Sequence, residues 1–555
     1  MKNFNVLSRR SFLDRSTKAG LAAALATLTD IPFVMKRALA EGSIGLNGKK
    51  VLFIWLRFGN DGLNNIIPIQ DPEYAAIRST IEITKDALDY SVTGPADFPV
   101  SSAVGTDTNF ATHWYNKGIR LGNGFAALHP ALKFLAPVYN AGDLALIHRV
   151  AYPKQSRSHF DSQNYWENGN PNNNLSKDGI FYRTIIESGL ANTAPLTGIS
   201  IQSALPLILR GSAAAMTNLT SPTRYDLLGV PTPANDTKAF NAMAAGNYYP
   251  FAAKRNRDLL ELQYQNMSNT LRIFGGIDFS EAGNIFRDTA NTDGDTAPYY
   301  LFPTTNAKNG GYAFHSNNAA KYVVPTGQYN FFGNLKAAAM ILNKTDAIIA
   351  GTELSGFDTH QTQGGATGGH ASLLQTVGWA MYAVQKYFTQ YAEKVGWNDV
   401  VVVTLSEFGR TSVENSNSGT DHAEAGVMYC AGGAIKGFGQ GNPSGVFGCS
   451  PTEFTSGDAR NWVTGTRTGL LSTCNTMYAA GVPFSGNALP VAAGYLRRSN
   501  DYRSILGEII RKHLGSTQNQ LNKIIPGYAT AGEHLLDGGT SSVDGVPIRG
   551  ELGIL

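Results

Sequence analysis

The chain has 555 residues, with 45 Lys or Arg against 42 Asp or Glu and a formal net charge of +3. Residues 1–40 hold seven of the basic residues and two of the acidic ones, so the rest of the chain carries 38 and 40, a net charge of −2. Without a basic excess outside the first 40 residues, the sequence offers no case for nucleic-acid binding. The length fits two domains or one large domain with insertions.

The first 40 residues have the pattern of a cleavable export signal. A paired-arginine motif at 8–13 (SRRSFL) precedes a modestly apolar stretch at 19–28 and the small-residue site Ala38-Leu39-Ala40. This order is typical of a twin-arginine signal, and the apolar stretch is too short to span about 30 Å of hydrocarbon. We therefore expect passage through the twin-arginine translocase, cleavage after Ala40 and a periplasmic or secreted protein. No membrane span is expected in the mature chain.

Apolar runs alternate with helical patterns along most of the mature chain. An uninterrupted apolar run predicts a strand buried on both faces, as in a parallel sheet. The predicted strands are 51–56, 144–150, 347–350 and 400–403, and the predicted helices are 129–139 with a kink at Pro137, 158–166, 335–342, 371–395 and 501–514. This alternation predicts an α/β fold whose mainly parallel central sheet is flanked by helices and places ligands at the carboxyl ends of its strands.

Two stretches depart from that alternation. Residues 211–327 contain a polar and aromatic helical segment at 259–274 and then long loops, and we interpret them as an inserted cap. Residues 437–487 are rich in Gly, Ser and Thr. The predicted organisation is thus a signal at 1–40 and one α/β domain at 41–555. Three cysteines, Cys430, Cys449 and Cys474, permit one disulfide in an oxidising compartment. No phosphate loop or GxGxxG motif indicates a nucleotide cofactor.

Ligand-type side chains follow four of the predicted strands. They lie at Asp61, in 156–161 (SRSHFD), in 357–360 (FDTH), and in 406–410 (SEFGR) together with 419–422 (GTDH). Each alone has an ordinary explanation, because a single Asp after a strand is commonly a turn or a helix cap and a loop His is often solvated. In a parallel sheet, however, the four strand ends share one edge, so these groups can converge.

Carboxylates and neutral imidazoles are ligands for divalent metals, with zinc as the first expectation and manganese, magnesium or calcium as alternatives. Two metals about 3.5–4 Å apart would clamp the oxygens of an in-line displacement. A serine at a helix N-terminus beside them would be an activated nucleophile, and Arg157 or Arg410 would hold a phosphoryl or sulfuryl group.

Several strings resemble, in the same order, motifs of a bacterial family catalogued as domain of unknown function 1501. They are 56–64 (LRFGNDGLN), 156–166 (SRSHFDSQNYW), 357–360 (FDTH), 406–411 (SEFGRT), 419–422 (GTDH) and 501–504 (DYRS). The resemblance extends from about residue 49 to 514. It implies a fold similar to the alkaline-phosphatase and sulfatase superfamily, in which metal ligands lie on strand ends in this order.

By that resemblance, Asp61 corresponds to the first-strand ligand, Ser158 (or its competitor Ser156) to the nucleophile, and His422 to the late histidine ligand. Asp358 with His360 corresponds to the central ligand pair, and Glu407 stands where the superfamily usually has Asp. The candidate catalytic residues are Ser158, Arg157, His159 and Arg410, and the candidate metal ligands are Asp61, Asp358, His360, Glu407, Asp421 and His422.

Two departures from the superfamily pattern bear on the metal count. Glu407-Phe408 replaces an Asp-His pair, which removes one imidazole, and the spacing from Asp358 to His360 is tight. Both favour a single metal or an altered second site. No cysteine lies near Ser158, so the sulfatase formylglycine is not expected there.

Two functions are therefore weighed. The first is an exported metal-dependent hydrolase of phosphate or sulfate esters, acting on a small-molecule or glycan ester. The alternative is a non-catalytic periplasmic or envelope binding protein whose insertion stacks sugars. The aromatic residues behind that alternative are Tyr248, Tyr249, Phe251, Tyr299, Tyr300 and Phe302.

Overall fold

The computed structural model describes the core of the mature chain. The described residues are 44–84, 94, 96, 117–190, 196–212, 214, 216–221, 270, 273–280, 285–289, 299–304, 324–455, 458, 460–462, 495–530 and 532–555. The predicted signal, most of the predicted cap at 211–327 and all of 463–487, which includes Cys474, lie outside them.

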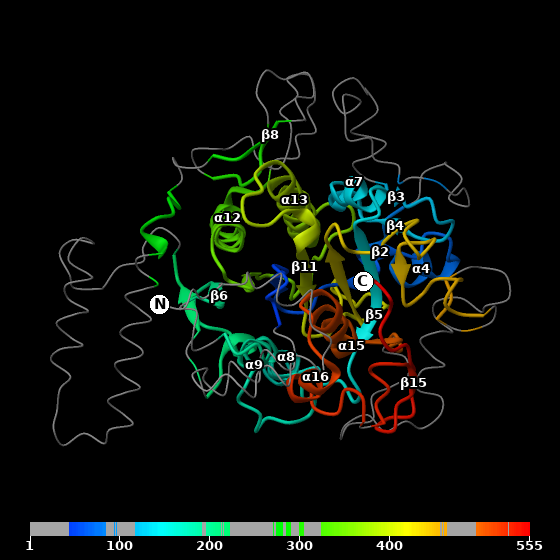
Figure 1. Ribbon diagram of the computed structural model, residues 1–555. Coiled ribbons are helices and arrows are strands. Elements are labelled where there is room, and N and C mark those ends of the chain that lie inside the picture. Colours follow the sequence, from blue (N-terminus) through cyan, green and yellow to red (C-terminus); the bar gives the residue numbers. More distant parts are fainter. Residues whose placement is uncertain are drawn as a thin grey trace, which may run out of the picture.

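A nine-stranded sheet forms the centre of the molecule (Figure 1). Its strand order is β13-β5-β12-β11-β1-β10-β6-β7, and β14 also pairs with β5. The strands are β1 (Lys50–Leu56), β5 (Leu144–Ala151), β6 (Gly198–Ile201), β7 (Thr217–Leu219), β10 (Ile349–Leu354), β11 (Val400–Leu405), β12 (Gly426–Ala431), β13 (Val446–Phe447) and β14 (Asn500–Asp501).

Eight of these nine strands run in one direction. β1 pairs in parallel with β10 and β11, β10 with β6, β6 with β7, and β5 with β13 and β14. β12 pairs antiparallel with both of its neighbours, β11 and β5. Its beginning therefore lies at the same sheet edge as the carboxyl ends of the other strands.

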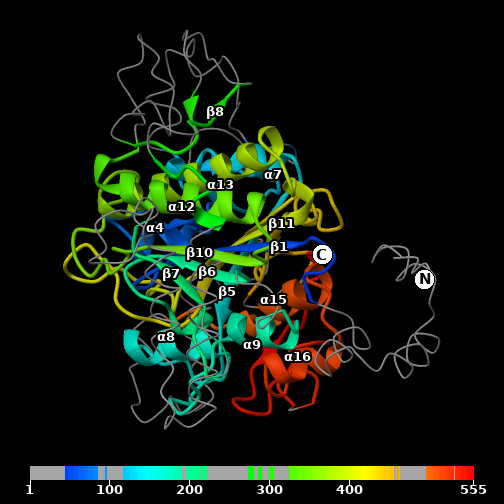
Figure 2. The same ribbon diagram turned by 60° about the vertical axis from the view of Figure 1, so that its left-hand side comes forward.

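Helices cover both faces of the sheet, which makes three layers (Figure 2). On one face lie α7 (Leu135–Asn140), α12 (Tyr329–Lys344) and α13 (Gly369–Gln390), and on the other lie α8 (His159–Asn168), α9 (Ile180–Glu187), α15 (Tyr502–Glu508) and α16 (Gln518–Ile524). Alternate side chains of β1 enter the two cores, Leu52 and Ile54 on the first face and Phe53 and Trp55 on the second. This is why the strand is apolar at every position from Val51 to Leu56.

Smaller elements surround these layers. They are β2 (Ile66–Ile67), β3 (Ile119–Arg120), β4 (Ala127–Leu128), α4 (Pro72–Ile77), β8 (Arg287–Asp288), β9 (Tyr299–Tyr300), β15 (Gly539–Thr540) and β16 (Pro547–Ile548). None of the helices in the described part of the chain has the length and apolar character needed to cross a bilayer.

Three predicted elements differ from the structure. The predicted helix 129–139 is divided into a 3-10 turn at Pro130–Leu132 and α7, and Pro137 lies in the first turn of α7, where a missing N–H removes no helical hydrogen bond. The predicted strand 347–350 is instead β10 at Ile349–Leu354, which continues through a polar end. The last predicted helix, 501–514, is α15 followed by a π-helical turn at Ile509–His513.

Candidate metal centre

The candidate site lies at the edge where the parallel strands end. After β5, a short loop leads to α8, whose first residue is His159. After β10 come Asp358 and His360, and β11 is followed by Glu407. His422 precedes β12 and reaches the same edge because that strand is antiparallel.

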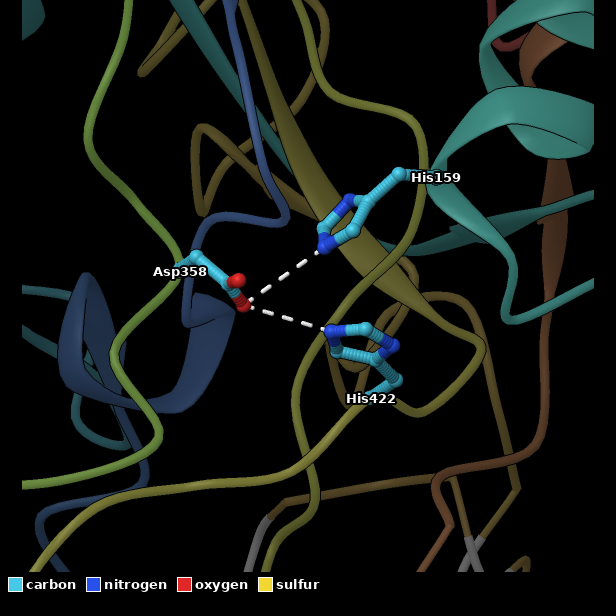
Figure 3. A group of neighbouring side chains, drawn as sticks. All are labelled: His159, Asp358 and His422. Carbon is cyan, nitrogen blue, oxygen red and sulfur yellow. Dashed lines mark hydrogen bonds and ion pairs between the residues drawn. The ribbon is translucent and has the colours of Figure 1, made fainter.

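Three ligand-type side chains converge at this edge (Figure 3). The ligand atoms of His159, Asp358 and His422 all lie within 4.8 Å of one another. Asp358 Oδ1 is 3.2 Å from His422 Nε2 and 3.5 Å from His159 Nε2. The dashed lines of Figure 3 mark these two contacts, which join elements far apart in the sequence.

His360 adds a third imidazole. Its Nε2 lies 3.1 Å from Asp358 Oδ1 and 2.9 Å from His422 Nε2. Three Nε2 atoms therefore surround one carboxylate oxygen.

The other ring nitrogen of each histidine is held by an acceptor. His422 Nδ1 lies 2.8 Å from the carbonyl oxygen of Arg157. His360 Nδ1 lies 2.8 Å from Asp421 Oδ1, and His159 Nδ1 lies 2.9 Å from Glu407 Oε1. Carbonyl and carboxylate oxygens accept, so each Nδ1 carries the proton. In the neutral imidazole, each Nε2 then has a free lone pair.

Apart from Arg410, which donates to Asp358, these tautomers leave only acceptors in the group. The Nε2 atoms of His360 and His422 lie 2.9 Å apart, and the three Nε2 atoms lie 3.1–3.5 Å from the Asp358 carboxylate. Such a group is repulsive unless a cation or protons lie among its members. Ligands about 2.1 Å from a tetrahedral metal stand roughly 3.4 Å apart, which is close to these separations. A histidine that ligates a metal usually donates its other ring N–H to a carboxylate or carbonyl oxygen in the same way.

Arg410 keeps the Asp358 carboxylate ionised. Its Nη2 donates to Asp358 Oδ1 at 2.5 Å. Partial burial acts to raise the pKa of Asp358, but the hydrogen bond and charge of Arg410 outweigh it and lower the pKa to about 2. Arg410 also donates to four backbone carbonyls, those of Phe58, Gly59, Phe357 and Thr420. Its guanidinium is thus committed to the protein rather than presented to an anionic substrate.

Glu407 holds His159 from the buried side of the ring. It is fully buried, and its Oε1 accepts from His159 Nδ1, from Gln163 Nε2 at 2.9 Å and from the Phe58 N–H at 2.8 Å. Burial acts to raise the pKa of Glu407, and the hydrogen bonds from His159 and Gln163 outweigh it and lower the pKa. Its ionised carboxylate anchors a histidine in this structure, rather than pointing among the Nε2 atoms.

Asp61 lies outside this group. Its carboxylate is buried and forms a two-point ion pair with Arg78, at 2.6 and 3.0 Å. Burial acts to raise the pKa of Asp61, but Arg78 outweighs it and lowers the pKa to about 2. Asp61, the predicted first-strand metal ligand, therefore forms an ion pair in the core instead of lying among the other predicted ligands.

The predicted catalytic serine directly precedes His159 in the chain. Ser158 is exposed and is the N-cap of α8, where its Oγ accepts from the Asp161 N–H at a long 3.4 Å. Ser156 Oγ accepts from the Ser158 N–H. The guanidinium of Arg157 donates to the Tyr495 hydroxyl at 2.5 Å and stacks on that ring.

The group is open to solvent on one side. The side chains of Asp358 and His360 are each 42% exposed, whereas those of His422 and His159 are 25% and 17% exposed. Phe408 closes the inner side, with its ring 4.7 Å from His159 and 4.6 Å from His422. A small molecule can thus approach Asp358 from outside.

Arg78 and Gln363, two residues that contact Asp61, were not predicted from the sequence. Arg78 is the C-cap of α4 and belongs to no motif. Gln363 follows His360 by three residues in the string DTHQTQ, so its proximity to the predicted ligands was the available signal.

One comparison with known proteins bears on this site. Residues 287–442 match the family described as protein of unknown function (DUF1501). That segment contains Asp358, His360, Glu407, Arg410 and His422, so the match supports the resemblance in the part of the chain that supplies most of the site. No curated protein and no solved structure matches the chain.

Proposed function

We propose that this protein is an exported hydrolase of phosphate or sulfate esters that works with a single divalent metal on an alkaline-phosphatase-like scaffold. The observation that carries the proposal is the set of three histidines whose Nδ1 atoms are all held by acceptors and whose Nε2 atoms all face Asp358. Four ligand atoms at one open edge fit one metal better than two.

The proposed ligands are His159, His360, His422 and Asp358. Imidazole-rich sets suit zinc and other transition metals, whereas magnesium and calcium prefer all-oxygen sites, so zinc comes first and manganese second. Such a metal, when bound, supplies Lewis-acid polarisation of an ester oxygen and acidifies a water.

The protein's own side chains would orient the ester and activate the nucleophile beside that metal. Ser158 lies at the N-terminus of α8, where backbone N–H groups stabilise a developing anion, and it is our candidate nucleophile. Arg157, one residue earlier, is the candidate for holding the ester's anionic group. Arg410 is a positioning residue, since it orients Asp358 and holds the backbone around it.

Elemental analysis of the mature protein, purified from the periplasm without chelator, tests the metal. We expect about one equivalent of zinc or manganese, lost in Asp358→Ala and in His422→Ala. His534→Ala is the matched control, because His534 is an exposed histidine 40% accessible to solvent that pairs only weakly with Asp537 at 3.7 Å. Wild-type protein that contains no stoichiometric metal would contradict the proposal.

A panel of aryl phosphate and aryl sulfate esters tests the chemistry. Turnover should disappear with a chelator and return with the metal, and Ser158→Ala should lower kcat by about 10²-fold or more if the serine is the nucleophile. A protein that binds metal yet hydrolyses no ester would favour the envelope binding protein. Of the aromatic residues behind that alternative, Phe302 is buried and Tyr300 stacks under Arg287, so neither forms an open sugar platform.

A further inference from the structure

Gln363 makes three hydrogen bonds in the interior beneath the candidate metal centre. Its side chain is 1% exposed. The Oε1 atom accepts from Thr359 Oγ1 at 2.8 Å and from Thr420 Oγ1 at 2.7 Å, while Nε2 donates to Asp61 Oδ2 at 2.7 Å. Because two hydroxyls face one end and a carboxylate faces the other, the amide has a single satisfactory orientation.

The two threonines belong to the two loops that carry three of the four proposed ligands. Thr359 stands between Asp358 and His360, and Thr420 comes two residues before His422. The loops also pair directly, since the Thr420 N–H donates to the Thr359 carbonyl at 3.0 Å. Gln363 therefore joins both loops through one oxygen atom, alongside the bonds that Arg410 and Asn415 make to them.

Two further backbone bonds fix the base of this arrangement. The Thr362 N–H donates to the Asn417 carbonyl and the Gln363 N–H to the Ser418 carbonyl, both at 2.9 Å. Thr362 and Ser418 have φ values of +46° and +54°, a left-handed backbone that costs free energy in residues other than glycine. Each of these two backbone bonds thus includes one residue in an unfavourable conformation. This indicates that the surrounding contacts constrain the two loops to one geometry.

Asp61 and Arg78 hold Gln363 from the core side. Besides its pair with Asp61, Arg78 donates to the carbonyl of Thr411 at 2.8 Å and to that of Ser412 at 2.8 Å, in the segment that follows Arg410. The chain of contacts thus runs from a buried ion pair through one amide to both ligand loops.

We propose that Gln363 is a positioning residue that sets the distance between the Asp358–His360 loop and the Asp421–His422 loop, with the Asp61–Arg78 pair as its anchor. This inference rests on the proposed metal centre and assigns Asp61 a supporting role in place of direct ligation. Without the amide, both threonine hydroxyls and one oxygen of Asp61 lose a partner, and the Nε2 atoms of His360 and His422 are no longer held 2.9 Å apart.

The test measures zinc affinity by competition with a chromophoric chelator, and ligand geometry by the visible spectrum of the cobalt(II)-substituted protein. Gln363→Leu should weaken zinc binding about 10- to 100-fold and alter the cobalt spectrum. The double variant Thr359→Val/Thr420→Val removes the same two hydrogen bonds from the other side and should reproduce both effects. It keeps the inference testable if Gln363→Leu fails to fold.

Gln520→Leu is the matched control, since Gln520 is also 1% exposed and hydrogen-bonded but caps α16 away from the candidate site. It should lower thermal stability while changing zinc affinity less than about twofold. If Gln363→Leu and the threonine variant both keep wild-type affinity and spectrum, the inference is wrong while the metal centre stands. If the wild type binds neither zinc nor cobalt, the proposed function fails as well, so the two failures differ in the wild-type measurement.

Discussion

Phe58 has a backbone conformation that a bulky residue rarely adopts. Its φ is +82°, yet its N–H donates to Glu407 Oε1 and its carbonyl accepts from Arg410 Nη2. The ring is 37% exposed and stands edge-on to His159 at 5.3 Å. Strain of this kind costs of order 1–3 kcal/mol and is commonly found at functional sites. Glu407, which holds His159, and Arg410, which holds Asp358, therefore also hold the backbone of Phe58.

The strain at Phe58 is measurable with two substitutions. Phe58→Ala and Phe58→Gly remove the same ring, but only glycine adopts a positive φ without a steric penalty. We expect Phe58→Gly to be more stable than Phe58→Ala by about 1 kcal/mol, although glycine ordinarily destabilises relative to alanine. Urea unfolding of the two variants checks this order. Greater stability of the alanine variant would show that the left-handed backbone does not persist in solution.

Among the elements, the strands were the most predictable part of the fold. β1, β5 and β11 are apolar at nearly every position because helices cover both faces of the sheet, and that burial is visible in the sequence. β10 was placed too early, since its last residues include Gly351, Thr352 and Glu353, which interrupt the apolar run. β12 was not among the predicted strands, and its direction has no signal of its own in the sequence, because an isolated apolar strand has the same pattern in either orientation.

The site was predictable in part for the same reason. Asp358, His360 and His422 were predicted as ligands because they follow predicted strands and match the superfamily pattern, and the structure brings them together. His159 was predicted to have a catalytic role, and in the structure its imidazole lies with them. The ion pair of Asp61 with Arg78 depends on a tertiary contact between separate loops, which no periodicity or spacing reveals.

The turn that leads from β11 toward β12 depends on the absence of a side chain at Gly409. A Cβ there would lie 2.1 Å from the carbonyl oxygen of Ala425, a backbone atom that cannot move aside cheaply. Gly409→Ala should therefore displace the segment that carries Arg410 and His422. We expect a loss of roughly 1–3 kcal/mol of stability and of metal binding. Thermal unfolding and metal content of the purified variant are the measurements.

Gly333 supplies the control for that substitution. It lies within α12, and a Cβ at this position meets no atom within 4 Å. Gly333→Ala should raise stability by about 0.5–1 kcal/mol, because alanine favours the helix. Equal behaviour of the two variants would contradict the close approach at Gly409.

At the scale of the whole molecule, buried neutral histidines make stability depend on pH. Burial lowers the pKa of His148 to about 3 and that of His513 to about 4, whereas an unfolded histidine titrates near 6.5. Between these values the unfolded chain binds more protons than the folded protein. The contribution of these histidines to the free energy of unfolding is therefore fully present above about pH 6.5 and is lost as the pH decreases toward 4. Each such group contributes up to about 1.4 kcal/mol per pH unit.

His513→Gln isolates one of these groups. Glutamine can still donate to the Lys50 carbonyl that His513 Nε2 contacts at 3.0 Å, but it does not titrate. We expect the variant to lose less stability than the wild type between pH 6.5 and 4, measured by urea unfolding at fixed pH with a chelator present to remove the contribution of metal binding. Parallel stability curves for both proteins would show that His513 is already protonated when folded.

The four proposed ligands are far apart in the sequence, and this bears on the proposed export route. The four proposed ligands come from segments between residues 159 and 422, so they meet only after the sheet has formed. A twin-arginine substrate crosses folded, and its metal would be acquired in the cytoplasm and carried across. We expect Arg9→Lys/Arg10→Lys to leave folded, metal-containing precursor in the cytoplasm, whereas Arg15→Lys, outside the pair, should be exported normally.

Replacing residues 1–40 by a signal for unfolded chains separates export from metal loading. The redirected protein would fold outside the cytoplasm, and its metal should then follow the composition of the medium, whereas the protein with its own signal should contain the same metal in every medium. Elemental analysis of both periplasmic proteins, grown with excess manganese or excess zinc, measures the difference. If the metal of both proteins varies with the medium, the site is loaded after export and folding before transport does not determine which metal it holds.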